Sequence, residues 1–505
     1  MPNAIILQPE YLLPGPTAAG ILHGAAVAVV SNRIAAVAAP PELAARWPDA
    51  RVIALPDCVV MPGLVNAHQH GRGLSQIQLG YHDTFLESWI AGRRARGALD
   101  AYAVTRLAAA RMVANGVTTA VHANYSYGTG DYEQEFRDQC RAYDSVGLRV
   151  TMCVGAMDRG SVVYPPHESC FLAGLNADLK AWLSSPGAPA YAGDGPATIA
   201  LMERLLKDFG AHPRIRLCYG PAGPQWVSDE LWSVIALDAA DKKLGLHLHA
   251  LESPAQRRAA KELYPEGVFQ RLENLGVMTG RTVVAHGVWV EESDMTILAR
   301  NGVTVVRNPG CNIRMRNGIA PLARYLERGV RVAIGTDNCS MMDDEDLLSE
   351  LRLAGHLARE PDWDGPSPPE VDDLLAMATT SGAAAAQYAD EIGTLEPGMR
   401  ADIAAFSLKR TRDPWLDQDM PLMDAFLSKA QGNDARLTMV DGRVLYQDGA
   451  FADPTISDAE ELAVASARAA RIPVDSANRE RTRRLQRHLC EHYRVLADEP
   501  SARNY

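Results

Sequence analysis

Short apolar runs separated by turn residues open the chain. The runs Ala25–Val30 and Arg51–Leu55 are rich in alanine, valine and isoleucine, and Gly, Pro and Asp residues stand around them. Runs of this kind, bounded by turn residues, are typical of β-strands. Residues 1–60 are therefore expected to form the first part of a small β-sheet domain.

The pattern changes from residue 58 to about residue 390. Short apolar runs that end in polar residues alternate there with alanine- and leucine-rich stretches of helical period, which indicates repeated βα units. Candidate strands begin near Cys58, Gly116, Leu148, Ile215, Leu244, Thr282, Val303 and Arg331. Eight such units predict an α/β fold in which residues 61–390 form a closed, TIM-like (β/α)8 barrel.

Strand and turn signals return after residue 390. They occupy Gly393–Ile403 and Leu437–Leu445, and we expect residues 391–455 to complete the sheet begun at the N-terminus. Residues 456–505 are expected to be a helical extension. Their basic run Arg479–Arg484 is interpreted as a solvated helix face, with a subunit contact as the alternative.

Composition and charge limit the class of protein. The 505 residues exceed what one hydrophobic core usually serves, and the content of 47% apolar and 22% charged residues is typical of a soluble globular enzyme. The net charge of -12 argues against nucleic acid as a partner, because phosphate backbones are bound by clustered Lys and Arg. We expect a small-molecule substrate, no membrane association, and a homodimer or higher homo-oligomer.

Cysteine usage indicates a reducing compartment. The eight cysteines are scattered between Cys58 and Cys490 without a Cys-x-x-Cys pair, which favours buried reduced thiols over a disulfide framework. The first residues also lack the basic region and apolar run of a signal peptide. The expected location is therefore the cytoplasm.

The strongest local motif is Pro62–His70 at the end of the first candidate barrel strand. Side chains alternate along a strand, so His68 and His70 point to the same side, into the barrel mouth. Such a pair can hold one metal ion. Because His-x-His also occurs in buried polar networks, the motif alone leaves both interpretations open.

Further histidines and an acid stand at the ends of later strands. His249 ends the fifth strand, His286 the sixth, and Asp337 follows the eighth. A barrel assembles its active site at these strand ends. Three imidazoles and a carboxylate suit one divalent ion, zinc before iron or manganese.

This ordered set resembles the amidohydrolase superfamily, within it the cytosine and guanine deaminases and the triazine (atrazine and melamine) aminohydrolases, over residues 4 to 450. The resemblance implies a metal-dependent hydrolase of carbon–nitrogen bonds other than peptide bonds, with a composite β-sandwich from both chain ends beside the barrel. It implies His68, His70, His249 and Asp337 as metal ligands, with Glu252, His286 and Asp337 as catalytic residues.

Two departures refine the resemblance. Relatives with two metal ions bridge them with a lysine on the fourth strand, but Arg214–Pro221 contains none, so we expect one ion per chain. Relatives often have a His-Cys-Pro or similar segment after strand seven, where this chain has Arg307–Asn312. The substrate is therefore not carried over from the resemblance.

The expected catalytic roles follow from residue chemistry. Asp337 accepts a proton from the attacking water, and His286 polarises the electrophilic centre or stabilises the charge that develops there. Glu252, three residues beyond His249, protonates the leaving nitrogen. His247 is interpreted as a hydrogen-bonded residue of the barrel interior rather than a ligand, because it lies one pleat deeper than His249.

Five residues are candidate substrate contacts, each with packing or a structural role as the alternative: Trp89, His122, Gln225, Trp226 and Trp289. A structural role is favoured for His122. The expected reaction is deamination of an N-heterocycle. The alternatives are hydrolysis of an exocyclic amide, urea or carbamate, as in phenylurea-like xenobiotics, and, more remotely, a catalytically inactive scaffold.

Overall fold

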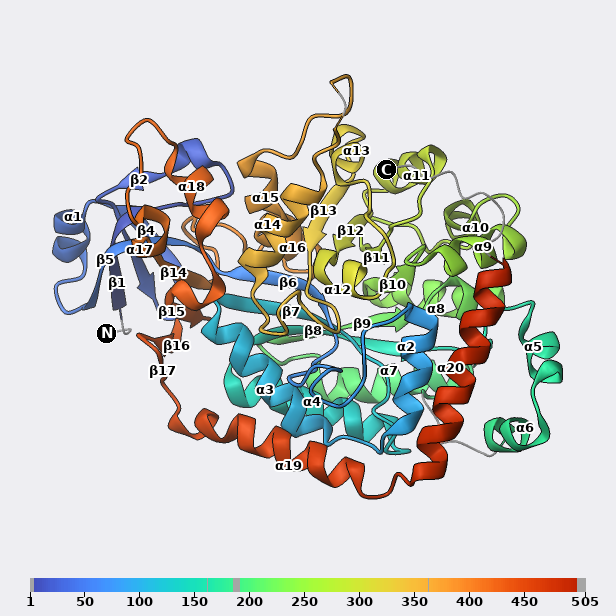
Figure 1. Ribbon diagram of the computed structural model, residues 1–505. Helices are drawn as coiled ribbons and strands as arrows, with labels where there is room; N and C mark the ends of the chain where they lie inside the picture. Colours follow the sequence, from blue (N-terminus) through green and yellow to red (C-terminus); the bar gives the residue numbers. More distant parts are fainter. Residues whose placement is uncertain (1–3, 161, 185–190, 362, 497–505) are drawn as a thin grey trace.

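A computed structural model describes residues 4–160, 162–184, 191–361 and 363–496 of the chain. Over these residues the strands form two sheets, an eight-stranded parallel barrel and a nine-stranded mixed sheet beside it (Figure 1). The two sheets account for the two kinds of apolar pattern in the sequence. The predicted fold class is confirmed.

The barrel strands follow one another in chain order. They are β6 (Leu64–Gln69), β7 (Val117–Ala123), β8 (Arg149–Ala156), β9 (Ile215–Pro221), β10 (Leu246–Ala250), β11 (Thr282–His286), β12 (Thr304–Arg307) and β13 (Arg331–Ile334). Neighbouring strands pair in parallel, and helices cover their outer side. A strand buried on both faces is apolar throughout, which explains the continuous Val- and Ala-rich runs.

The last barrel strand meets the first at their carboxyl ends. Gln69 and Asp337 form an isolated parallel bridge there. The Asp337 backbone N–H donates a hydrogen bond of 2.9 Å to the His68 carbonyl. The closure of the barrel therefore lies at the residues predicted to bind metal.

Helices follow the barrel strands in the chain, and most of them cover the outside of the barrel (Figure 1). They are α3 (Ala101–Ala114), α4 (Tyr132–Val146), α5 (Glu168–Gly174), α6 (Ala177–Ser184), α7 (Gly195–Phe209), α8 (Asp229–Lys242), α9 (Pro254–Leu263), α10 (Val268–Asn274), α11 (Glu292–Arg300), α12 (Pro309–Arg314), α13 (Leu322–Glu327), α14 (Leu347–Leu357), α15 (Val371–Ala378) and α16 (Thr380–Ala385). Of these helices, α5 and α6 lie at the periphery of the molecule (Figure 1). Several helices of the group are preceded by a residue whose side chain accepts a hydrogen bond from a backbone N–H of the first turn. These residues are Asp100, Asp131, Asp194, Ser228 and Ser253. Asp and Ser are among the preferred residues at this position.

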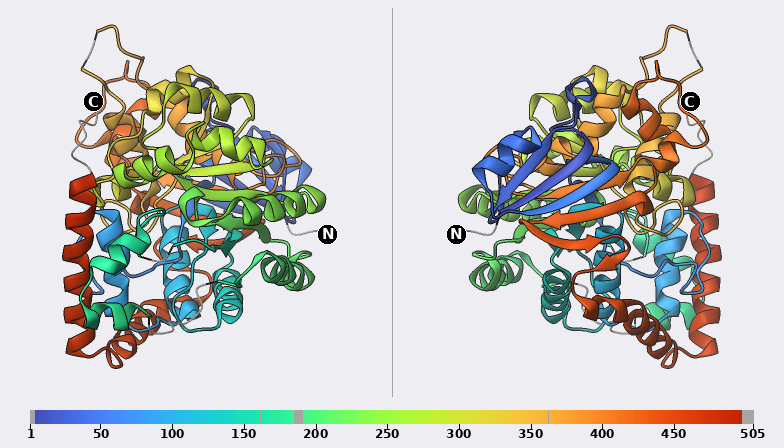
Figure 2. Two further views of the ribbon diagram at one scale, coloured as in Figure 1. Left: turned by 90° about the vertical axis from the view of Figure 1, so that its right-hand side faces the viewer. Right: turned by 90° about the vertical axis from the view of Figure 1, so that its left-hand side faces the viewer.

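The second sheet is built from both ends of the chain. Its strands are β1 (Ala4–Leu12), β2 (Leu22–His23), β3 (Ala26–Val30), β4 (Arg33–Ala38), β5 (Arg51–Pro62), β14 (Ile403–Ser407), β15 (Ala435–Val440), β16 (Arg443–Gln447) and β17 (Ala450–Phe451), with helices α1 (Pro40–Arg46), α17 (Lys409–Arg412) and α18 (Leu422–Lys429). β14 pairs with β5, which joins the C-terminal strands to the N-terminal ones (Figure 2). The expected completion of the sheet is confirmed.

The start of the first barrel strand differs from the prediction. Cys58 belongs to β5, which pairs with β1 and β14 in the other sheet, and the barrel begins at Leu64. Gly63 lies between the two strands, where a Cβ atom would come within 2.2 Å of the Thr118 side chain. The apolar pattern runs through this break, so periodicity alone does not locate it. The other seven candidate starts lie within two residues of the observed ones.

The C-terminal extension contains α19 (Ala459–Arg471) and α20 (Ser476–Leu496), and α20 packs against α2 (Leu86–Gly92) (Figure 1). In the basic run, Arg481 and Arg484 bind Asp178 of α6 at 2.9 and 3.0 Å. These arginines thus pair within the chain, on a partly solvated helix face. The expected homo-oligomer stays a prediction.

Thiol burial departs from expectation at two positions. Six cysteines are buried: Cys58, Cys140, Cys153, Cys218, Cys311 and Cys339. Cys170 and Cys490 are exposed; Cys170 lies in α5, a helix with no buried residue, and Cys490 lies near the C-terminal end of the described chain. Within the described ranges, no helix combines the length and the apolar character needed to cross a bilayer.

A buried ion pair joins the barrel to the second sheet. Arg149 of β8 donates two hydrogen bonds to Asp402, of 2.6 and 3.0 Å, and both side chains are buried. We expect Asp402→Asn to lower the free energy of unfolding by about 3 kcal/mol, because it removes the nearer of the two carboxylates that pair with the buried guanidinium and leaves only Asp441 Oδ1 at 3.3 Å. Asp448→Asn removes the acid of the exposed pair with Arg436 and should cost less than about 1 kcal/mol. Urea denaturation measures both, and equal losses would contradict the expectation.

Candidate metal centre

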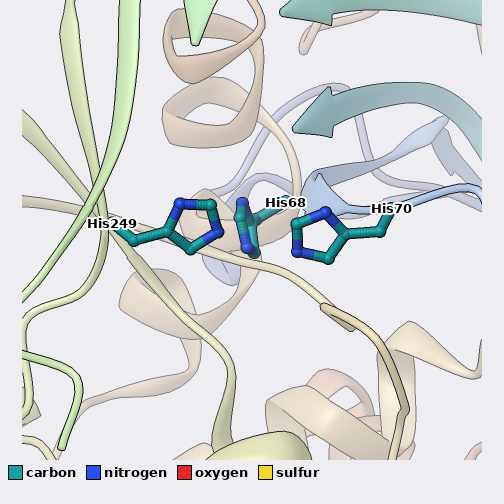
Figure 3. Close-up of side chains that lie close together, drawn as sticks. All are labelled: His68, His70 and His249. Atoms are coloured by element: carbon teal, nitrogen blue, oxygen red, sulfur yellow. The ribbon is translucent and has the colours of Figure 1, made fainter. Parts of the chain in front are cut away.

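Three histidines converge at the carboxyl end of the barrel (Figure 3). His68 lies in β6, His70 directly follows that strand, and His249 lies in β10. His68 and His70 are buried, and His249 is partly exposed to the cavity above it. One ring nitrogen of each lies within 4.8 Å of the others, so the three imidazoles can share one ion.

Hydrogen bonds orient each of these rings. His70 Nδ1 lies 2.5 Å from the Ala123 carbonyl, and His249 Nδ1 lies 3.1 Å from the Ala222 carbonyl. A carbonyl only accepts, so both Nδ1 atoms donate and both Nε2 atoms keep a free lone pair. His68 Nδ1 lies 2.8 Å from His247 Nε2. Such outer contacts fix the tautomer of a metal-binding histidine.

Asp337 adds a carboxylate to the three imidazoles. Its Oδ1 lies 2.9 Å from His70 Nε2 and 3.3 Å from His68 Nε2. His68 Nε2 is buried and has no hydrogen-bond partner among the described residues. When His68 donates through Nδ1, its Nε2 carries no proton. The lone pairs of His68 Nε2 and of the Asp337 carboxylate then face each other. A divalent cation held by the three imidazoles and the Asp337 carboxylate would satisfy all four groups. Nitrogen and oxygen donors of this kind fit such an ion.

Burial sets the charge of the imidazoles. It lowers the pKa of His68 to about 4, and it lowers the pKa of His249 well below its usual value, with the neighbouring His68 and His70 adding to the effect. Both rings are therefore neutral at pH 7. Neutral imidazole is the form that binds a metal ion.

Glu252 and His286 lie on the other side of the centre. Glu252 Oε2 is 3.5 Å from His286 Nε2, and Asn317 donates a hydrogen bond of 2.8 Å to Glu252 Oε1. Burial raises the pKa of Glu252 well above its usual value, and the charges of Asp337 and Glu87 raise it further. A raised pKa favours the protonated form of a carboxyl group, and in that form the group can act as an acid.

His286 is held by a segment that departs from the family pattern. Its Nδ1 lies 3.0 Å from Asn312 Oδ1, in α12 after the seventh barrel strand. Its Nε2 faces Glu252 and Asp337, the latter at 3.8 Å. The backbone φ of His286 is 76°, a conformation that non-glycine residues rarely adopt and that concentrates at functional sites.

A cavity of about 670 Å³ opens above these residues. Its lining includes His70, His249, Glu252, His286 and Asp337, together with Trp89 and Trp226. Two of the five predicted substrate contacts therefore lie at the cavity wall. His122, Gln225 and Trp289 are absent from this lining in the described part of the chain.

Those three residues have contacts elsewhere. His122 is buried and its Nδ1 lies 2.8 Å from the Tyr143 hydroxyl. Gln225 is buried beside Gly223. Trp289 donates a hydrogen bond of 2.7 Å to the Asn317 carbonyl, so it supports the residue that binds Glu252 rather than facing the cavity.

Several residues at the site had no place in the sequence analysis. Glu87 of α2 lines the cavity and accepts a hydrogen bond of 3.1 Å from the Tyr164 hydroxyl. Leu485 and Tyr493 of α20 also line it. The segment Arg307–Asn312, which departs from the pattern of relatives, was the sequence signal that could have pointed to Asn312. No local pattern connects α20 with a site some 400 residues earlier in the chain.

A parallel barrel with imidazoles, a carboxylate and a further buried acid at its carboxyl end is the arrangement of a metal-dependent hydrolase. Comparisons with known proteins agree. The model of the Amidohydrolase family matches residues 59–445. The 5'-deoxyadenosine deaminase of Methanosarcina mazei is 30% identical over 451 residues, which cover 88% of this chain and 93% of that protein.

Other relatives and solved structures extend the comparison. The 5-methylthioadenosine/S-adenosylhomocysteine deaminase of Nitratidesulfovibrio vulgaris is 29% identical, covering 89% of this chain and 94% of that protein. An adenosine deaminase from Xanthomonas campestris with bound zinc has a TM-score of 0.72 at 23% identity, covering 94% and 99%. A mutant atrazine chlorohydrolase from Arthrobacter aurescens, complexed with zinc and atraton, has a TM-score of 0.76 at 22% identity, covering 92% and 100%.

The chain belongs to the amidohydrolase family. It is a hydrolase that acts on carbon–nitrogen bonds. The prediction of family and enzyme class made from the strand-end histidines is confirmed. The His and Asp cluster also supports the expected divalent metal.

The two histidines of β10 provide a test of the ligand set. His249 Nε2 is free, whereas His247 Nε2 contacts His68. We expect His249→Ala to abolish metal binding and His247→Ala to retain the ion with about 10–100-fold weaker affinity, because His247 only orients a ligand. Metal content after dialysis against a weak chelator measures both. Loss of metal from His247→Ala alone would reverse the assignment.

Proposed function

We propose that this chain deaminates an N-heterocycle of the adenine type, with one zinc ion per chain. The proposal rests on one observation above all, the buried Glu252 carboxyl, which lies 3.5 Å from His286 beside the histidine cluster and lines a cavity of about 670 Å³. That volume lies in the range occupied by small-molecule ligands. The named activities of the relatives, deaminases of adenosine derivatives, agree with it.

In this proposal His68, His70, His249 and Asp337 hold the ion, and catalysis belongs to the barrel, residues 61–390. The sheet formed by residues 1–60 and 391–455 and the extension 456–505 support the barrel. A bound divalent ion supplies a water molecule of lowered pKa and polarises the electrophilic carbon.

The chain's own groups move the protons. Asp337 accepts the proton of the attacking water. Its Oδ1 lies against His70, and its Oδ2 lies on the side of His286 and is the oxygen that can take the proton. The proton on Asp337 then passes to the ring nitrogen, and Glu252 gives its own proton to the leaving amino group, so that ammonia departs as a neutral molecule. The remaining hydroxyl proton of the former water returns to Glu252 as the carbonyl forms, which restores the acid. Asn317 holds the Glu252 carboxyl, and Asn312 holds His286 so that its Nε2 faces the reacting centre.

A substrate panel separates deamination from the alternative, hydrolysis of an exocyclic amide, urea or carbamate. We expect the zinc-loaded enzyme to release ammonia from adenosine derivatives, because the buried acid of the site is suited to protonating nitrogen. N-aryl ureas and carbamates should release no amine. Ammonia and amine assays measure both, and amine release without ammonia release would favour the alternative.

The acid role of Glu252 has a matched test. Glu252→Gln keeps the shape of the side chain but removes its proton, so we expect kcat to fall by about 10²–10⁴-fold with the metal retained. Glu262→Gln makes the same change on the outside of α9, where Glu262 contacts His167, and should leave kcat unchanged. Activity of Glu252→Gln close to that of the native enzyme would assign the proton to another group.

Metal stoichiometry tests the single-ion site. The fourth barrel strand β9 has no lysine to bridge a second ion, so we expect about one zinc per chain by elemental analysis. Chelation should abolish activity and lower the thermal midpoint, and zinc should restore both. Two tightly bound ions per chain would contradict the proposal.

A further inference from the structure

Arg72, Arg93 and Arg96 gather at one side of the cavity; a fourth arginine, Arg94, also lines the cavity and has Glu168 as an acidic neighbour. Arg93 opens a short 3-10 helix, η2 (Arg93–Ala95), and Arg96 follows it; both line the cavity. Arg72, two residues beyond His70, lies behind them with 5% of its surface exposed. The loop after the first barrel strand therefore places three guanidinium groups beside the metal centre.

Arg72, Arg93 and Arg96 have no acidic partner in the described part of the chain. The ionisable side chains with the largest influence on Arg93 and Arg96 are arginines and tyrosines, and no carboxylate is among them. Arg72 Nε, Nη1 and Nη2 have no hydrogen-bond partner within the described ranges. Arg93 donates one hydrogen bond of 3.2 Å, to the Ser126 carbonyl.

Arginines elsewhere in the fold provide a comparison. Arg149 binds Asp402, and Arg314 binds both Asp83 and Asp343, whereas the buried Arg307 binds only the Ala320 carbonyl among the described residues. Single buried arginines thus occur in both forms, but the cavity gathers several without an acid in the described structure. An uncompensated buried charge costs several kcal/mol. The unpaired cluster is therefore costly to the folded protein, and an anion delivered by a ligand would offset that cost.

Two tyrosines hold the guanidinium groups in place. The Arg93 guanidinium carbon lies 4.0 Å from the Tyr125 ring centroid, and that of Arg72 lies 4.5 Å from Tyr125 and 5.0 Å from Tyr127. Such cation–π contacts are worth about 0.5–2 kcal/mol, less than the desolvation cost of the charge. They orient the cluster without neutralising it.

Tyr125 also ties the cluster to the metal centre. Its ring centroid lies 4.7 Å from that of His70, and its hydroxyl donates a hydrogen bond of 2.7 Å to Asn338, the neighbour of Asp337. One aromatic ring thus separates the arginines from a proposed metal ligand. A single small molecule can reach both places in the cavity.

We propose that Arg93 and Arg96 bind an anionic group of the substrate, a carboxylate or a phosphate, while Arg72 adds positive charge behind them. The inference rests on the proposed function and narrows it, since the substrate becomes an adenine-type heterocycle with an acidic substituent. A guanidinium fork matches both oxyanions with two parallel hydrogen bonds. Burial and the charges of Arg72 and Arg93 lower the pKa of Arg96 to about 9, so it remains a cation at neutral pH.

Substrate pairs with matched heterocycles test the site. We expect kcat/KM to be at least about tenfold higher for adenosine 5'-monophosphate or S-adenosylhomocysteine than for adenosine, since a hydrogen bond to a charged group contributes about 1.5–3 kcal/mol. Comparison of adenosine 5'-monophosphate with S-adenosylhomocysteine shows whether the site prefers a phosphate or a carboxylate. A preference for neutral adenosine over both would overturn the inference.

Variants then locate the effect. Arg93→Met and Arg96→Met should raise KM for the anionic substrate by a factor about tenfold larger than the factor by which they raise KM for adenosine. Arg93→Lys keeps the charge, so its KM for the anionic substrate should lie between that of the native enzyme and that of Arg93→Met. The control is Arg483→Met, which changes an exposed arginine on α20. Equal losses on charged and neutral substrates would show that the arginines only support the fold.

A binding measurement separates this inference from the proposed function. Inorganic phosphate and acetate at equal ionic strength should raise the thermal midpoint of the zinc-loaded native protein, and this shift should be smaller in Arg93→Met. A reduced shift without turnover of any panel compound would support the anion site while the proposed function fails. Identical shifts in both proteins would overturn the anion site.

Discussion

The closure of the barrel at Asp337 is the constraint on which the site depends. β13 and β6 meet through the bridge between Gln69 and Asp337, and the Asp337 N–H binds the His68 carbonyl. Asp337 adopts a φ of 57°, which brings its carboxylate against His70 and His68. The same contact therefore completes the barrel and gathers the proposed ligands, so loss of closure would scatter them.

Burial gives these groups their chemical character. The surrounding protein removes most of the solvent from these side chains, which lowers the pKa of the His68 imidazole and raises the pKa of the Glu252 carboxyl. Part of this shielding comes from far along the chain, because Leu485 and Tyr493 of α20 form one wall of the cavity. Gln486 anchors that helix by donating a hydrogen bond of 2.9 Å to the Ser88 carbonyl of α2. The C-terminal extension thus belongs to the environment of the catalytic groups.

Global charge and local charge differ in this protein. The net charge of -12 argues against an extended polyanion such as nucleic acid. It does not describe the cavity, where Arg93 and Arg96 lie with tyrosines rather than carboxylates as neighbours. A field inside a cavity depends on the nearest groups, because charges separated by solvent are screened within about 10 Å. A small substrate with one acidic substituent is compatible with both observations.

The sequence by itself determined the barrel and the convergence of His68, His70, His249, His286 and Asp337, because strand period and the position of a residue at a strand end are local properties. Tertiary structure decided where β5 ends and β6 begins, since the apolar pattern continues through Gly63 and only strand pairing divides it. It also decided that Asn312 orients His286 and that Trp289 supports Asn317 instead of facing the cavity. The wall formed by α20 and the grouping of the arginines were likewise decided there. These contacts join segments far apart in the chain, and such packing leaves no periodicity within either segment.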